Sequence, residues 1–426
     1  MLSWGALVLL TARAVAQIPA HSNVDYQDVK PVYENGNAEY SDPVPAAHRP
    51  FLGFNPVDFE PFARPFGPAE TSGYGNGPRP KIGFFGSYER LYWSFSKPAT
   101  AEIGSVTAEG PAINPISFEP TIWTNTADTG WMQANPAWGN RTEVGYIDTN
   151  DYGWLASVLD HVSQGQFTQV QNARVNFDDP AHLLDVFFLG FNLGKFPPNF
   201  VFLNLKNVTK INGVEIMRMY RPPRLHDGGY IDVMWGARFL QLDDTFVVNG
   251  DNVNVTNFVT GSTSYFFDPL SNSTWSTRAQ NNMIGPQVGL RWAHQRARWI
   301  WSSEFRFLGA ANFQGVHQKT SLGDVTGPNL TLFGPDPLNI IPGIGSRTHS
   351  FATTFSPVGE LRLQFSYQAT SNVALKFGYT GLVMGNITRA SNRIDYSGPT
   401  LVSILPGGIH QTFYSNGINF GVEVNR

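Results

Sequence analysis

The chain of 426 residues contains no cysteine, which excludes disulfide bridges, thiolate metal sites and cysteine nucleophiles. Charged residues are scarce at 15%, against about 25% in a typical soluble domain. The net charge is only −4 and no basic patch stands out, so nothing indicates nucleic-acid binding. Beyond the N-terminus, no apolar run approaches the ~18 residues of a membrane-spanning helix. Phosphate-binding glycine loops and nucleophile elbows are absent too.

The segment Phe355–Met384 instead alternates apolar and polar residues, as two strands joined by a turn at 368–372 would. In the first strand Leu361, Leu363 and Phe365 oppose Glu360, Arg362 and Gln364, and in the second Leu375 and Phe377 oppose Lys376. A soluble β-sandwich would give the same alternation. However, each arm runs for about a dozen residues, which is enough to cross a bilayer at a tilt.

The same pattern recurs and predicts about ten strands. They are expected at 82–95, 141–148, 151–159, 213–220, 230–242, 282–292, 299–307, the two arms of 355–384, and 411–424. The links between them alternate long and short, with loops expected at 96–140, 160–209, 243–279, 312–351 and 386–410. This predicts an all-β fold, an antiparallel up-and-down transmembrane barrel with long extracellular loops and short periplasmic turns.

The N-terminal part reads differently from the barrel. Residues 1–16 hold a short apolar run followed by Ala14-Val15-Ala16, which predicts a secretory signal peptide. Residues 17–81 are rich in proline, glycine and aromatic residues without a period, which predicts a poorly ordered periplasmic leader. Residues 82–426 would form the barrel, in a bacterial outer membrane and with both termini periplasmic.

Alternation also assigns side chains to the two faces of the barrel wall. The residues predicted to line the lumen are Asp232, Arg238, Gln287, Arg291, Glu304, Arg306, Glu360, Arg362, Gln364, Lys376 and Glu423. Those predicted to face lipid are Ile231, Val233, Trp235, Phe239, Val288, Leu290, Trp292, Trp299, Trp301, Phe305, Leu361, Leu363, Phe365, Leu375, Phe377 and Phe420. Because the lumen charges carry both signs and about ten strands enclose a narrow space, an ion-paired plug is favoured over a weakly selective conduit.

Catalysis is the less favoured alternative. Asp243 and Asp244, expected at the outer end of a strand, could meet His349 or His410 at the rim, as in omptin-like barrel proteases. Aspartates in such loops usually solvate a turn, so no catalytic residue is assigned. The segment 249–254 offers alternating oxygen ligands but lacks the glycine and glutamate of an EF-hand, so no metal or cofactor is predicted.

Several short strand motifs resemble one family. Tyr88-Glu89-Arg90-Leu91-Tyr92-Trp93, Val144-Gly145-Tyr146-Ile147-Asp148, Gly285-Pro286-Gln287-Val288-Gly289-Leu290 and Gly417-Ile418-Asn419-Phe420-Gly421 are similar to strands of the outer-membrane family called beta-barrel porin seven. The resemblance covers about residues 82–424 and implies an outer-membrane barrel with a poorly defined solute. Such barrels usually end in an aromatic residue, whereas this chain ends Val424-Asn425-Arg426.

The expected partners follow from this fold. They are outer-membrane lipid and, during biogenesis, the barrel-assembly machinery; no nucleic acid is expected. A second copy of the chain or an envelope protein could dock through the long loops, which include the apolar run 338–342. A passive pore and an envelope-structural or surface-binding barrel therefore remain open as alternatives.

Overall fold

The computed structural model describes residues 83–105, 112–113, 120–121, 124–178, 185–188, 191–195, 199–222, 225, 229–251, 258–259, 262–263, 272–323, 344–407 and 409–425. The predicted signal peptide and leader, the apolar run 338–342 and residues 252–254 of the candidate calcium loop lie outside this part. Within the described residues, no helix combines the length and the apolar character that crossing a membrane requires.

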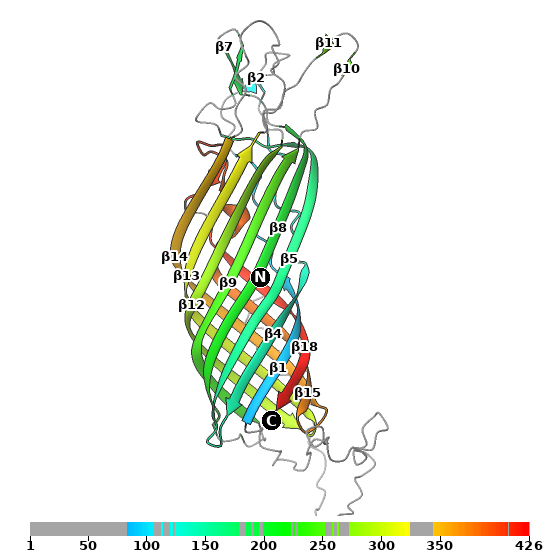
Figure 1. Cartoon of the computed structure of the whole chain (residues 1–426), viewed down its shortest axis with the longest axis vertical. Helices are drawn as coiled ribbons and strands as arrows, with labels where there is room; N and C mark the ends of the chain where they lie inside the picture. Colours follow the sequence, from blue (N-terminus) through cyan, green and yellow to red (C-terminus); the bar gives the residue numbers. More distant parts are fainter. Residues whose placement is uncertain are drawn as a thin grey trace, which may run out of the picture. The chain divides into compact units, whose positions relative to one another are not determined.

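Ten antiparallel strands close into a barrel (Figure 1), as the sequence predicted. They are β1 (Gly83–Phe95), β4 (Pro136–Ile147), β5 (Tyr152–Arg174), β8 (Asn199–Tyr220), β9 (Tyr230–Asp251), β12 (Ser273–Arg296), β13 (Trp299–Leu322), β14 (Ile344–Gln368), β15 (Val373–Ile387) and β18 (Gln411–Asn425). Each strand pairs with its sequence neighbours, and β18 pairs with β1 to close the ring. Closure leaves no exposed sheet edge.

The connections separate the two ends of the barrel. Five long ones, at 96–135, 175–198, 252–272, 323–343 and 388–410, lie at one end, and four short turns, at 148–151, 221–229, 297–298 and 369–372, lie at the other. The long connections carry four two-stranded sheets: β2 (Ala112–Ile113) with β3 (Pro120–Thr121), β6 (Asp185–Phe188) with β7 (Phe191–Lys195), β10 (Phe258–Val259) with β11 (Ser262–Thr263), and β16 (Ile394–Asp395) with β17 (Ser403–Ile404). β1 begins and β18 ends beside the short turns, because Phe85 pairs with Asn425.

The strands are much longer than the sequence predicted, so three expected loops are partly wrong. β5 and β8 extend into 160–209, β9 and β12 extend into 243–279, and β13 and β14 extend into 312–351. In β5 the cause is a β-bulge between Leu159 and Val162, followed by a positive φ of 50° at Asn172. Each irregularity reverses which residues point inward, so the period is broken in the sequence although the strand continues.

In the other long strands, the period continues but the faces exchange character. Near the short turns, β12 shows Leu290 and Val288 outward; farther along, its outward residues are Gln280 and Arg278, while the apolar Trp275 is buried inside. We call the outward apolar part of the barrel wall the apolar belt. Beyond it, β12 turns polar residues outward and apolar ones such as Trp275 and Ala279 inward, as a water-soluble protein does. Such a stretch does not match the pattern of a lipid-facing strand.

Candidate functional site

The residues predicted to line the lumen all lie on the inner side of the barrel wall. Asp232, Arg238, Gln287, Glu304, Arg306, Glu360, Arg362 and Lys376 are buried, whereas Arg291, Gln364 and Glu423 are partly exposed. Of the sixteen residues predicted to face lipid, fourteen are exposed on the outer side, and Ile231 and Phe365 are intermediate. Trp235, Leu290, Phe305 and Leu363 are 44%, 49%, 53% and 45% exposed, so they do not pack in a dry interior.

Among the described residues, a network of ion pairs lies inside the barrel. Seven carboxylates and seven cations form ion pairs in the half nearer the short turns, and we call these residues the charged layer: Glu89, Glu143, Glu215, Asp232, Glu304, Glu360, Glu423, Arg141, Arg221, Arg238, Arg291, Arg306, Arg362 and Lys376. Burying a charge is costly unless it is paired and hydrogen-bonded. The balance of signs makes complete pairing possible.

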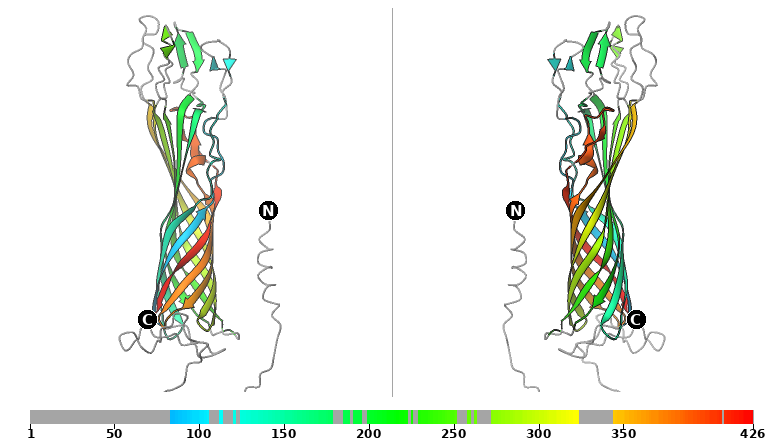
Figure 2. Two further views of the ribbon diagram at one scale, coloured as in Figure 1. Left: turned by 90° about the vertical axis from the view of Figure 1, so that its right-hand side faces the viewer. Right: turned by 90° about the vertical axis from the view of Figure 1, so that its left-hand side faces the viewer.

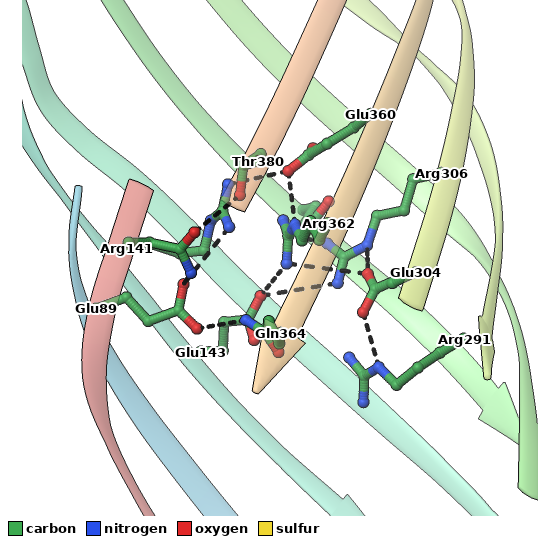
Figure 3. Close-up of polar contacts among 12 residues, drawn as sticks. Glu89, Arg141, Glu143, Arg291, Glu304, Arg306, Glu360, Arg362, Gln364 and Thr380 are labelled. Atoms are coloured by element: carbon green, nitrogen blue, oxygen red, sulfur yellow. Dashed lines mark hydrogen bonds and ion pairs between the residues drawn. The ribbon is translucent and has the colours of Figure 1, made fainter. Parts of the chain in front are cut away.

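Several of these pairs cross the lumen instead of joining neighbouring strands. Arg141 on β4 donates a hydrogen bond of 2.9 Å to Glu360 on β14, and Arg362 on β14 donates one of 2.6 Å to Glu143 on β4. In the ring of strands, β4 and β14 are separated by β1, β18 and β15. Arg306 on β13 likewise reaches Glu215 on β8. Figure 3 shows Arg141, Glu143, Glu360 and Arg362 converging from different strands.

Glu360 is a carboxylate of the charged layer that contacts three arginines. It accepts hydrogen bonds from Arg141 at 2.9 Å, from Arg238 at 2.5 Å and from Arg362 at 2.6 Å. The four side chains are between 1% and 4% exposed. Solvent therefore has almost no access to these four side chains.

A second group at the edge of the charged layer surrounds Glu89. Lys376 lies 3.0 Å from this carboxylate, and Gln364 donates a hydrogen bond of 2.7 Å to it. Asn419 adds another of 3.1 Å. Lys376 also lies 3.4 Å from Glu423, whose side chain is 30% exposed. Solvent therefore reaches the outer edge of the network and not its centre.

An apolar layer follows the charged layer along the strands. On moving along the barrel away from the short turns, Glu360 of β14 is followed by Val358. In the same direction, Glu89 of β1 is followed by Leu91, Trp93 and Phe95. The layer consists of buried residues from nine of the ten barrel strands: Leu91, Trp93, Phe95, Leu159, Val162, Ile211, Leu240, Leu242, Met283, Leu308, Ala310, Val358, Leu382, Met384, Ile387 and Phe413. These side chains form one buried apolar cluster inside the barrel.

The segment 388–404, which we call the internal loop, occupies the lumen beyond the apolar layer (Figure 2). Arg389 lies 3.0 Å from Asp244 of β9, and the backbone N–H of Ala390 donates to the same carboxylate at 2.9 Å. Asn281 of β12 accepts from the Thr388 N–H at 2.9 Å and donates to the Thr388 carbonyl at 2.8 Å. These bonds join the loop to the opposite wall.

Farther into the same end, the internal loop has its own apolar core. Ala390, Ile394, Tyr396, Leu401 and Val402 pack against inward residues of the long strands, including the buried Trp275. The rings of Tyr396 and Trp275 meet edge to face at 6.3 Å between centroids. Burial raises the pKa of the Tyr396 phenol, which keeps it neutral.

The candidate protease pair is not formed. Asp244 points inward to Arg389, while Asp243 points outward and pairs with Arg278, because adjacent residues of a strand face opposite sides. Neither lies at a strand end, since β9 continues to Asp251. His349 lies on the outer surface opposite His317. The two aspartates therefore do not form the acidic pair that was expected at the rim.

The candidate calcium segment is also different from the expectation. Residues 249–251 belong to strand β9 and not to a loop. Among the described residues, no group of three histidine, aspartate or glutamate side chains is arranged to hold a metal ion.

The sequence reasoning missed five of the fourteen residues of the charged layer: Glu89, Arg141, Glu143, Glu215 and Arg221. Arg141, Glu143 and Glu215 lie on the inner faces of predicted strands, so the alternation in those strands was a signal that could have found them. Glu89 lies on β1, whose two faces both carry aromatic residues. Arg389 belongs to a loop, and only the tertiary structure brings it to Asp244.

With this geometry in place, comparison with known proteins identifies the family. Residues 202–425 match the family described as "Putative beta barrel porin-7 (BBP7)". The chain belongs to this family. The match spans more than half of the chain and confirms the family that the strand motifs predicted. A member of the beta-barrel porin-7 family that forms a closed barrel with an apolar belt is an outer-membrane β-barrel protein.

The beta-barrel porin-7 chain also resembles solved barrels distantly. A major outer membrane protein from Thermus thermophilus is 9% identical, with a TM-score of 0.26, over 81% of this chain and 99% of that one. The toluene transporter TbuX of Ralstonia pickettii is 10% identical, with a TM-score of 0.29, over 86% of this chain and 98% of that one. Similarity this low carries no argument about function. No curated protein matches the chain.

Proposed function

We propose that this porin-family barrel is closed at rest and conducts little or no steady ion current. The observation that supports the proposal best is the burial of ion pairs that cross the lumen, such as Arg362 with Glu143 and Arg238 with Glu360. The apolar layer and the internal loop close the lumen again at two further levels.

The energetics of ion pairs agree with this proposal. In a hydrated channel, an ion pair contributes only about 0–1 kcal/mol, so a narrow network of this kind would open readily to water. In a dry interior, each charge needs a partner, and removing one partner costs about 3–5 kcal/mol. Seven acids paired with seven bases therefore form a rigid, self-consistent plug.

We further propose that the long connections are extracellular and that the N- and C-terminal strands begin and end on the periplasmic side. The support is the asymmetry between long connections at one end and short turns at the other, which outer-membrane barrels share. Access of an added protease to a cleavage site inserted at 405–407, the exposed part of the 388–410 connection, tests the orientation in intact cells. Cleavage only after the outer membrane is permeabilised would reverse it.

Planar bilayers test the closed lumen. Purified protein, with insertion verified by resistance to unfolding in cold dodecyl sulfate, is expected to give no steady conductance steps, while an open porin reconstituted in parallel gives them. Large and reproducible steps from the purified protein would overturn the proposal.

A variant locates the barrier within the lumen. Glu360→Ser combined with Arg362→Ser removes one buried acid and one buried base, so the net charge of the lumen is unchanged. We expect this variant to remain silent as well, because the apolar layer still closes the barrel. Conductance in the variant alone would place the whole barrier in the charged layer.

A second candidate function is favoured by the length of the strands. β14 spans 25 residues, whereas about 9–11 tilted residues cross a bilayer. About 15 residues of β14 therefore project beyond the apolar belt, or roughly 40 Å at a typical tilt and rise. Such a projection suits an envelope-structural or surface-binding role. Electron cryomicroscopy in nanodiscs should show this projection on one side only; a barrel flush with both bilayer faces would remove the argument.

A further inference from the structure

A cationic pocket lies on the outer surface of the barrel, beyond the apolar belt. It has a volume of about 360 Å³, and its lining includes Arg278 of β12, His317 and Lys319 of β13, and Arg347 and His349 of β14. These side chains are on the outward faces of their strands, as the inward Gln318 beside them is buried. The pocket is separate from the charged layer and has no part in closing the lumen.

The strand register places like charges directly opposite one another. Lys319 pairs with Arg347. Like charges at directly opposed positions destabilise a sheet. Arg278 is compensated by Asp243, to which it donates through both Nε and a terminal nitrogen. Within the described residues, neither Lys319 nor Arg347 has an ion-pair partner. An anion that binds between these two cations would therefore stabilise the strand pair.

An apolar strip runs from the belt to the edge of this pocket. Phe355, Phe313 and Phe351 are 59%, 51% and 70% exposed on the outer faces of β14 and β13. The ring of Phe351 lies 5.6 Å from that of His317 and 5.7 Å from that of His349. At the register positions beside Phe313 and Gly315, β12 carries the polar Asn282 and Gln280. The strip is therefore confined to the two strands that hold Lys319 and Arg347.

We propose that this surface binds a phosphorylated membrane lipid, with the phosphate on Lys319 and Arg347 and an acyl chain along Phe351 and Phe355. Cations immediately beyond an apolar surface match the order of headgroup and chain in a lipid leaflet. A free phosphate would use the cations and leave the exposed phenylalanines unexplained. The assignment to the outer leaflet rests on the proposed orientation, whereas the binding itself does not depend on a closed lumen.

Native mass spectrometry of the full chain in detergent tests the site. The probe is lipid A, an acylated disaccharide with two phosphates, and its dephosphorylated form is the matched lipid control. Lys319→Gln combined with Arg347→Gln is expected to weaken lipid A binding about 30-fold, from about 1 kcal/mol for each cation near a phosphate. Lys206→Gln with Lys210→Gln removes the same charge from exposed positions on β8 and is expected to change binding less than threefold.

A third variant and a competitor separate the lipid from its phosphate. Phe351→Ala should weaken binding of lipid A severalfold, and millimolar inorganic phosphate should fail to displace the lipid. Folding of each variant is checked by its mobility in unheated dodecyl sulfate gels. Equal losses in the β13–β14 and β8 variants, or equal binding of dephosphorylated lipid, would overturn the proposal. Displacement by inorganic phosphate would overturn it in favour of a free-anion site.

Discussion

Replacing Glu360 by glutamine removes one negative charge from the centre of the charged layer with almost no change of shape. Three arginines, Arg141, Arg238 and Arg362, donate hydrogen bonds of 2.5 to 2.9 Å to this carboxylate, and all four side chains are buried. Glutamine can accept through one oxygen only, so the substitution leaves an uncompensated positive charge in a dry interior. Breaking a buried pair in this way costs about 3–5 kcal/mol.

The matched control is Glu423→Gln. The Glu423 side chain is 30% exposed and lies 3.4 Å from Lys376, so solvent takes over much of the role of the carboxylate. We expect a loss of about 0–1 kcal/mol for this variant. Both substitutions change the net charge equally, and they differ in burial and in the number of arginines that lose a partner.

Urea unfolding in phospholipid vesicles, followed by tryptophan fluorescence, measures both free energies. Adding Arg238→Gln to Glu360→Gln restores the balance of signs. The free energy of unfolding that the double variant loses should therefore be smaller than the sum of the two single losses, by about 1 kcal/mol or more. A loss below about 1 kcal/mol for Glu360→Gln, or equal losses for Glu360→Gln and Glu423→Gln, would refute a dry, fully paired interior.

Three further predictions concern the barrel wall and the internal loop. Gly236→Ala should destabilise the barrel or prevent its assembly, because the added Cβ would lie 2.0 Å from the Ile216 carbonyl oxygen, whereas Gly359→Ala meets nothing within 4 Å and should be neutral in the same unfolding assay. Asp244→Asn weakens the buried attachment of Arg389 and should make the internal loop sensitive to protease in folded protein; unchanged protection would contradict the attachment. Leu290→Arg, on the apolar belt, should cost about 2–4 kcal/mol in vesicles, and Gln280→Arg on the same face of β12 should cost less than about 1 kcal/mol; equal costs would contradict the limit assigned to the belt.

The sequence alone determined the strand count, the antiparallel order and the alternation of long and short connections. It did so because the outward residues of the apolar belt, such as Leu363 and Leu290, alternate with polar residues such as Arg362 and Gln287. A period of two is a local property, because it can be recognised from consecutive residues alone. The family resemblance rests on the same strands.

The tertiary structure alone decided what fills the barrel. Arg362 and Glu143 are far apart in the sequence and lie on opposite walls, so only closure of the ring brings them within 2.6 Å. Two features kept the sequence pattern from predicting the long strands. The bulge after Leu159 breaks the period of two. Beyond the belt, polar and apolar residues exchange faces, and a sequence pattern does not show where the lipid ends. The docking of Arg389 on Asp244 likewise depends on a connection folding back into the lumen, which no local period specifies.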